Sequence, residues 1–275
     1  QWTDNTVGIA PDGTIYAVGT GPDAQTGALV QVRVDTSVGA PRLQRGWTAH
    51  IQGSSAASPS ISPDGRHLKI TDGNSTAGLL NPSSVEARAL IFDLPACDAN
   101  TDADPDPLLC APSLTLPLLS GPALGASPIL NDLEHYVWEV QLAGLFDHTV
   151  PDIVRYSGTD VVWRADLPGD ALWTSVLTVT DNHIVGTQSR MTPSGRRLVS
   201  LELPQSSSSE VVVLDRGTGE VVFSAPVTDD STSTVTIGPD GSLYVTQLGL
   251  LSGFAIETRI TGGVIRFAPA APLGD

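Results

Sequence analysis

The sequence predicts an all-β fold, and three observations lead to this prediction. A pattern of apolar strand, tight turn and apolar strand recurs along the chain. Each copy is followed by a strand that ends in aspartate and by a closing strand that often carries an aromatic residue, while almost no segment shows helical periodicity. Glycine (27 residues) and proline (21 residues) are frequent and aromatic residues are only 5% of the 275, which is typical of a chain with many turns.

The hairpins are the clearest part of the repeat. Five segments contain a two-residue turn between apolar strands, and in most of them the turn ends in glycine, which tolerates the positive φ that such turns require. The segments are "VGIAPDGTIYAVG" from Val7, "PSISPDGRHLKITDG" from Pro59, "SPILNDLEHYVWEV" from Ser127, "SRMTPSGRRLVSLEL" from Ser189 and "VTIGPDGSLYVTQL" from Val235. The predicted turns are Asp12-Gly13, Asp64-Gly65, Asn131-Asp132, Ser194-Gly195 and Asp240-Gly241.

The second half of each unit adds two more strands. One ends in aspartate, as in "VRVD" (Asp35), "LIFD" (Asp93), "WRAD" (Asp166) and "VVLD" (Asp215). The closing strands read "RGWTAHI", "ALWTSVL" and "VVFSAPV". Four strands per unit, at intervals of roughly 45 to 70 residues, predict a β-propeller of four-stranded antiparallel blades, about five of them visible in this chain. A β-sandwich is the alternative, but sandwiches do not repeat this whole order of elements.

One repeat also indicates a family. The segment "VLDRGTGEVVF", Val213 to Phe223, resembles the repeat of quinoprotein-type (PQQ-like) propellers, Ala-x-Asp-x-x-Thr-Gly-Lys/Glu-x-x-Trp. Phe223 stands where that repeat has its docking tryptophan, and "ADLPGDALW" repeats the pattern more loosely with Gly169 and Trp173. The resemblance implies a propeller in which the aromatic residue docks one blade against the next, and it implies no activity. The matching positions are Asp215, Thr218, Gly219 and Glu220.

We predict a single propeller domain over residues 1–275, or a fragment of one. The last unit, from Val235, offers two hairpin strands and a third, "GGVIRFA", but no fourth. The segment "QWT" at the start of the chain resembles the end of a fourth strand. Two alternatives stay open: the two ends complete one blade and close a five-bladed ring, or the chain is a piece of a larger ring.

The segment "CDANTDADPDPLLC", from Cys97 to Cys110, is an acidic insertion at 97–110 that follows the Asp93 strand. Its ends are the two cysteines of the chain. We predict that they form a disulfide, which would place the protein outside the cytosol, as a secreted, periplasmic or cell-surface protein. We also expect the protein to be bacterial.

The insertion also contains candidate calcium ligands. Oxygen-bearing side chains at every second position can surround one hard cation, as in calcium loops of the Asp-x-Asn-x-Asp type. However, Ala103 replaces the glycine expected at the sixth position, and no glutamate stands at the twelfth. A solvated acidic loop is therefore the alternative. The candidate ligands are Asp98, Asn100, Asp102, Asp104 and Asp106.

The charge of the chain limits its partners. The formal net charge is −16, and Lys69 is the sole lysine. Such a field repels nucleic acid and anionic membranes, and no apolar run approaches the roughly 20 residues of a membrane span. We therefore expect an unknown protein or small-molecule partner, with no nucleic acid and no membrane span.

The sequence lacks an assembled catalytic motif, so we predict a non-enzymatic binding or scaffolding module. PQQ is not expected as a cofactor, because the chain has neither the adjacent cysteines of the PQQ dehydrogenases nor a CxxCH haem site. The alternative is a propeller enzyme, a calcium-dependent lactonase-like hydrolase or quinoprotein dehydrogenase with its site in the central channel. A third alternative is a fragment of a multidomain surface protein. The residues to inspect for catalysis are Glu134, His135, Asp147, His148, Asp181 and His183.

Overall fold

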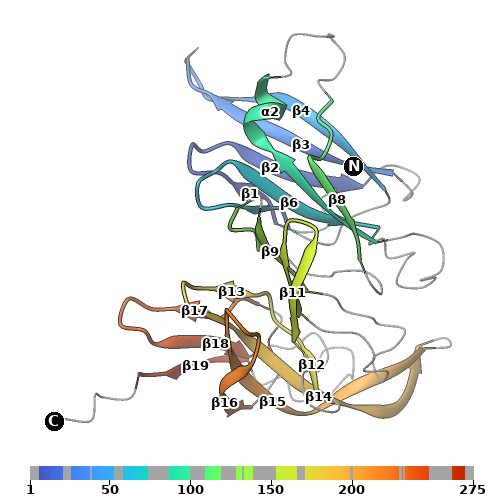
Figure 1. Ribbon diagram of the computed structural model, residues 1–275, viewed down its shortest axis with the longest axis vertical. Coiled ribbons are helices and arrows are strands. Elements are labelled where there is room, and N and C mark those ends of the chain that lie inside the picture. Colours follow the sequence, from blue (N-terminus) through green and yellow to red (C-terminus); the bar gives the residue numbers. More distant parts are fainter. Residues whose placement is uncertain are drawn as a thin grey trace. The chain divides into compact units, whose positions relative to one another are not determined.

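A computed structural model gives the fold (Figure 1). It describes residues 6–20, 26–37, 39–52, 58–73, 87–99, 109–118, 128–131, 133–138, 153–165, 171–198, 201–228, 231, 233–247 and 262–269. The chain divides into two compact units, residues 1–142 with 153–162, and residues 143–152 with 163–275.

Five antiparallel sheets account for the described strands, and apart from β13 the strands of each sheet are neighbours in the order in which they follow along the chain. The first sheet contains β1 (Gly8–Ile9), β2 (Ile15–Thr20), β3 (Thr26–Asp35) and β4 (Arg42–Gln52). The second contains β5 (Ser60–Ile61), β6 (His67–Asp72), β7 (Arg88–Asp93) and β8 (Leu114–Pro117). The third contains β9 (Glu134–Trp138), β10 (Ile153–Ser157) and β11 (Asp160–Ala165).

The two remaining sheets belong to the second half of the chain. The fourth contains β12 (Ala171–Trp173), β14 (His183–Leu198), β15 (Leu201–Asp215) and β16 (Val221–Val227), and the short β13 (Thr178–Val179) also pairs with β14. The fifth contains β17 (Thr236–Ile237), β18 (Leu243–Gln247) and β19 (Gly263–Phe267). The described helix is α2 (Leu94–Ala99). The chain is therefore a β-propeller of consecutive antiparallel blades, as the sequence predicts.

The cores lie between neighbouring sheets rather than inside one sheet. One cluster joins Trp47 and Leu29 of the first sheet to Phe92 and Leu68 of the second. A second cluster joins the second and third sheets, and a third cluster joins the fourth and fifth. Each blade is thus stabilised by burying its faces against the next one.

The Asp-Gly turns are confirmed, but the loops are longer than two residues. The Ala10 N–H donates to the Thr14 carbonyl at 2.8 Å, so the loop encloses Pro11, Asp12 and Gly13, with Gly13 at φ 85°. The Thr14 N–H donates to Asp12 Oδ1 at 2.9 Å and holds the pKa of that carboxyl below its usual value. Gly65 and Gly241 have the same positive φ, at 70° and 77°. These turns are three-residue or longer hairpin loops that need a residue with positive φ.

The turn predicted at Ser194-Gly195 is wrong. Both residues lie inside β14, and Arg197 and Leu198 are paired with Glu202 and Leu201 of β15, so the chain reverses after Leu198. The β14–β15 ladder shifts register between Pro193 and Arg197 and continues past this point. The pairing of Arg197 and Leu198 with β15 therefore extends the hairpin past the predicted turn. Of the other predicted turn residues, Asp132 lies outside the described residues, whereas the Asn131 side chain accepts the N–H groups of Leu133 and Glu134.

The strand ends at aspartate are confirmed where they are described. β3, β7 and β15 end at Asp35, Asp93 and Asp215, whereas Asp166 lies outside the described residues. The last sheet has the three predicted strands in the described part of the chain, with β19 matching "GGVIRFA". Residues 1–3, the candidate for a fourth strand, lie outside the described residues.

The docking role predicted for Phe223 is wrong, because this side chain is 46% exposed on β16. Trp163 makes a docking contact instead. Its indole Nε1 donates to the Arg216 carbonyl at 3.0 Å, and its ring lies so close to Gly219 that a Cβ there would be 2.7 Å from Trp163 Cε3. Glycine is therefore required at position 219 for two reasons. Its φ of 78° favours glycine, and the Trp163 indole leaves no room for a Cβ.

We expect Gly219→Ala to lower the free energy of unfolding by about 2 to 4 kcal/mol, because the new methyl group meets Trp163 and strains a left-handed residue. Gly262→Ala is the matched control, since no heavy atom lies within 4 Å of its added Cβ. Urea denaturation followed by circular dichroism measures both variants. Equal stability of the two would show that the indole does not dock on Gly219.

Candidate functional site

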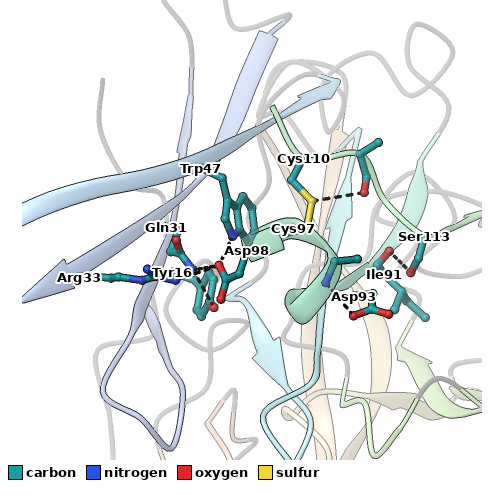
Figure 2. Close-up of a disulfide and its surroundings, with 12 residues drawn as sticks. Tyr16, Gln31, Arg33, Trp47, Ile91, Asp93, Cys97, Asp98, Cys110 and Ser113 are labelled. Carbon is teal, nitrogen blue, oxygen red and sulfur yellow. Dashed lines mark hydrogen bonds and ion pairs between the residues drawn. A yellow bond between two sulfur atoms is a disulfide. The ribbon is translucent and has the colours of Figure 1, made fainter. Parts of the chain in front are cut away.

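The candidate site is the acidic insertion, which begins with helix α2 directly after β7 (Figure 2). The predicted disulfide between Cys97 and Cys110 is present, with their Cα atoms 5.2 Å apart. Asp93, the last residue of β7, caps the start of the helix by accepting the Ala96 N–H at 3.2 Å. The predicted loop thus starts as a short helix that the disulfide ties to the returning chain.

Asp98 points away from the disulfide toward the first sheet (Figure 2). Its Oδ1 accepts the indole Nε1–H of Trp47 at 3.2 Å and the Nε2–H of Gln31 at 2.9 Å. Arg33 Nη2 lies 2.9 Å from the same oxygen. Trp47 is only 1% exposed, so Asp98 satisfies a buried donor that would otherwise lack a partner.

These contacts change the interpretation of the first candidate calcium ligand. Asp98 uses Oδ1 for three nitrogen partners, and the Arg33 guanidinium beside it repels a cation. Among the described residues, no three histidine, cysteine, aspartate or glutamate side chains are grouped so that they could hold a metal ion. The other candidate ligands, Asn100, Asp102, Asp104 and Asp106, lie outside the described residues, so a calcium site formed by them stays a prediction.

The returning chain also contacts the first sheet. Leu109 forms a parallel bridge with Thr48 of β4, and the Cys110 N–H donates to the Thr48 carbonyl at 2.8 Å. The insertion of the second blade therefore reaches the last strand of the first blade through two contacts, Asp98 at one end and Leu109–Cys110 at the other.

A second polar cluster lies between the second and third sheets and includes two residues inspected for catalysis. His135 Nε2 donates to the Gly158 carbonyl at 2.8 Å, which leaves Nδ1 as the acceptor facing Lys69 Nζ at 3.3 Å. Lys69 is 1% exposed and also donates to the Tyr136 carbonyl. Burial, and then the charge of Lys69, lower the pKa of His135 from 6.5 to about 3. His135 is therefore a neutral structural residue that orients a buried cation.

Of the remaining candidates for catalysis, Glu134 has structural partners, Asp181 and His183 are exposed, and two lie outside the described residues. Glu134 accepts the Tyr136 hydroxyl at 2.6 Å and pairs with Arg155 at 3.2 Å. The Asp181 carbonyl accepts a hydrogen bond from Arg216, and His183 is an exposed residue at the start of β14. Asp147 and His148 lie outside the described residues.

The sequence did not identify the partners of Asp98. Gln31, Arg33 and Trp47 come from β3 and β4, and "RGWTAHI" signalled only an aromatic strand. The sequence feature that could have indicated these partners is Gly46, directly before Trp47. A Cβ at Gly46 would lie 2.1 Å from Gln31 Oε1, so this glycine leaves room for the Gln31 side chain that reaches Asp98.

Within the described part of the chain, no helix has the length and apolar character needed to cross a membrane.

Comparisons with known proteins support the fold. No protein-family model matches the sequence, and no curated protein matches it. Among solved structures, 96% of the chain superimposes on 60% of BamB from Moraxella catarrhalis, with 12% identity and a TM-score of 0.50. The same share superimposes on 65% of hydrazine synthase from Kuenenia stuttgartiensis, with 14% identity and a TM-score of 0.52. Both are β-propeller proteins, and this chain spans less than two thirds of either, so the likeness shows the fold alone.

We expect Asp98→Ala to lower the free energy of unfolding by about 1 to 3 kcal/mol, because it leaves the buried Trp47 indole N–H without an acceptor. Asp98→Asn should cost less, since its amide oxygen can still accept that hydrogen bond. Asp160→Ala, at the exposed start of β11, is the control. Guanidinium denaturation followed by tryptophan fluorescence gives the values. If Asp98→Ala matched the control, the anchoring role of Asp98 would be excluded.

His135 should make the protein sensitive to mild acid. Its folded pKa of about 3 lies below the ordinary 6.5, so its stabilising contribution is complete above pH 6.5 and is lost as the pH falls toward 3. Relative to His135→Gln, we expect wild-type stability to drop by about 2 kcal/mol between pH 7 and pH 5. His183→Gln, which alters an exposed histidine, should keep the wild-type slope. Urea denaturation at several pH values measures all three, and a wild-type slope in His135→Gln would contradict the assignment.

Proposed function

We propose that this chain is a non-enzymatic β-propeller that acts outside the cytosol as a binding or scaffolding module. One observation carries the proposal: three of the described candidate side chains, Asp98, Glu134 and His135, are held in structural hydrogen bonds or ion pairs, and two of them, Asp98 and His135, connect neighbouring sheets. Asp98 holds the insertion on the first blade, and Glu134 and His135 have structural partners beside Lys69 and Arg155. A side chain committed to several buried hydrogen bonds is poorly placed to bind and release a substrate.

The disulfide supports an extracytoplasmic location. Disulfides persist in oxidising compartments, whereas cytosolic thiols are kept reduced. In this chain the disulfide closes a surface insertion, and both cysteines are largely buried against the cluster between the first two sheets. Cys97–Cys110 is thus a structural bond, of the kind that secreted or periplasmic proteins use.

We further propose that the repeats belong to the quinoprotein-type (PQQ-like) class and that the two compact units are parts of one propeller domain. The turn after β15 supports the family, because Asp215 Oδ1 accepts the Thr218 N–H at 2.8 Å and Gly219 accommodates the Trp163 ring. These residues carry the repeat's structural role. The proposal therefore includes neither PQQ chemistry nor a catalytic role for Asp215 or Glu220.

The long hairpin of β3 and β4 is the described surface that we expect to meet a partner. β2 pairs with β3 only as far as Val32, and beyond it β3 and β4 continue as a two-stranded ribbon. The cross-strand pair of Val34 and Leu43 on this ribbon is 47% and 74% exposed. A two-stranded ribbon with an exposed apolar pair is only marginally stable in water, and contact with another protein would stabilise it.

Calorimetric titration and activity assays test the function. We expect no heat on adding PQQ and no turnover of lactones, or of alcohols with PQQ and an electron acceptor. Calcium binding that raises the melting temperature without activity would agree with a structural ion. Micromolar PQQ binding, or lactone hydrolysis that requires calcium, would instead establish the enzyme alternative.

Immobilised protein incubated with the secreted or periplasmic fraction of the source cells tests the binding role. We expect one retained protein that, once purified, binds with a micromolar or lower Kd and binds at least tenfold more weakly to Leu43→Ser. Val264→Ser, which alters an exposed valine of β19, is the matched control. Equal binding to both variants would remove the ribbon from the proposal.

A further inference from the structure

The insertion covers the outer edge of the first blade. β4 is the last strand of the first sheet, and the outer edge of such a strand presents N–H and C=O groups that can pair with another chain. At Thr48 this edge is occupied by Leu109 and Cys110, through the parallel bridge and the 2.8 Å hydrogen bond from the Cys110 N–H to the Thr48 carbonyl. The covering segment thus protects the edge strand from outside partners.

The disulfide connects this covering segment to the anchored helix. Asp98 attaches α2 to Trp47, Gln31 and Arg33, and Cys97, one residue before Asp98, is bonded to Cys110 (Figure 2). The Leu109 side chain is 50% exposed, so its burial contributes little to holding the segment on the edge. The sulfur–sulfur bond therefore adds to the backbone bonds that hold Leu109–Cys110 at Thr48 and Ser113 at Ile91.

A solvent-open cavity lies beside that bond. Its volume is about 530 Å³, and both cysteines form part of its wall. A small dithiol can enter a cavity of this size, and both cysteines also belong to the cluster between the first two sheets. The lining residues are Asp93, Ala96, Cys97, Ala99, Cys110, Ala111 and Ser113.

We propose that the insertion is a thiol-sensitive clip on the edge of the first blade. A thiolate of a dithiol reductant attacks one cysteine sulfur, forming a mixed disulfide and releasing the other cysteine as a thiolate that takes up a proton. The second thiol of the reductant then displaces the first cysteine. Two electrons and two protons pass to the protein, which gains two cysteine thiols, and the reductant leaves as its own disulfide.

Reduction should release the clip without unfolding the blades. The ladder between β3 and β4 and the ladder between β6 and β7 do not include the cysteines. The cluster between the first two sheets keeps Trp47, Phe92, Leu68 and Leu29. The consequence of reduction is an uncovered strand edge at Thr48, which is a surface for pairing with an extended segment.

Hydrogen exchange followed by mass spectrometry tests the clip on the whole chain. After treatment with dithiothreitol, we expect peptides covering residues 109–113 to exchange at least tenfold faster, and peptides covering residues 94–99, which Asp98 anchors, to change less. Peptides covering β6, β7 and residues 211–215 should be unchanged. The double variant Cys97→Ser with Cys110→Ser should show the fast exchange without reductant and should not respond to it.

Two results would overturn the proposal. One is unchanged exchange at 109–113 when alkylation confirms that both cysteines are reduced. The other is acceleration of all peptides together, including 211–215, because the disulfide would then support the whole fold rather than a local clip. Local acceleration in both the reduced protein and the double variant establishes the clip.

Discussion

The structure depends on the packing of each sheet against the next. The three described clusters all draw their residues from two successive sheets: the first and second, the second and third, and the fourth and fifth. None of these three clusters belongs to one sheet, so a blade alone exposes the apolar faces that its neighbour covers. With aromatic residues at only 5% of the chain, these junctions rely mainly on aliphatic side chains and on a few tryptophans such as Trp47.

Hydrogen bonds and ion pairs at the same junctions specify how the apolar faces pack on one another. Asp72 of the second sheet accepts the Gln52 N–H from the first at 3.0 Å, and Arg88 neutralises its charge. Lys69 reaches from the second sheet to His135 in the third. A buried polar group without its partner raises the free energy of the folded state. Each of these bonds therefore disfavours arrangements in which the neighbouring sheet is displaced. This role explains why several titratable residues that resemble catalytic candidates are structural, and why the insertion connects two blades.

The local part of the fold could be predicted from the sequence, and its failures have physical causes. Turns at Asp12-Gly13, Asp64-Gly65 and Asp240-Gly241 formed because the aspartate side chain accepts a nearby N–H and the glycine takes a positive φ. Ser194-Gly195 has the glycine without the aspartate, and there the β14–β15 ladder shifts its register and resumes at Arg197. Of the candidate site, the disulfide was predictable because its cysteines are close in sequence, while the contacts of Asp98 were not.

The sequence by itself determined the strands, most of their turns, the repeat of the blades and the pairing of Cys97 with Cys110, because these features arise from residues close together along the chain. Only the tertiary structure decided what the side chains do between blades. Asp98 bonds Trp47 and Gln31, which are 51 and 67 residues away, and Trp163 bonds the carbonyl 53 residues ahead of it. Such partners are determined by the packing of whole sheets, and the sequence around a single residue does not indicate which distant strand will lie beside it.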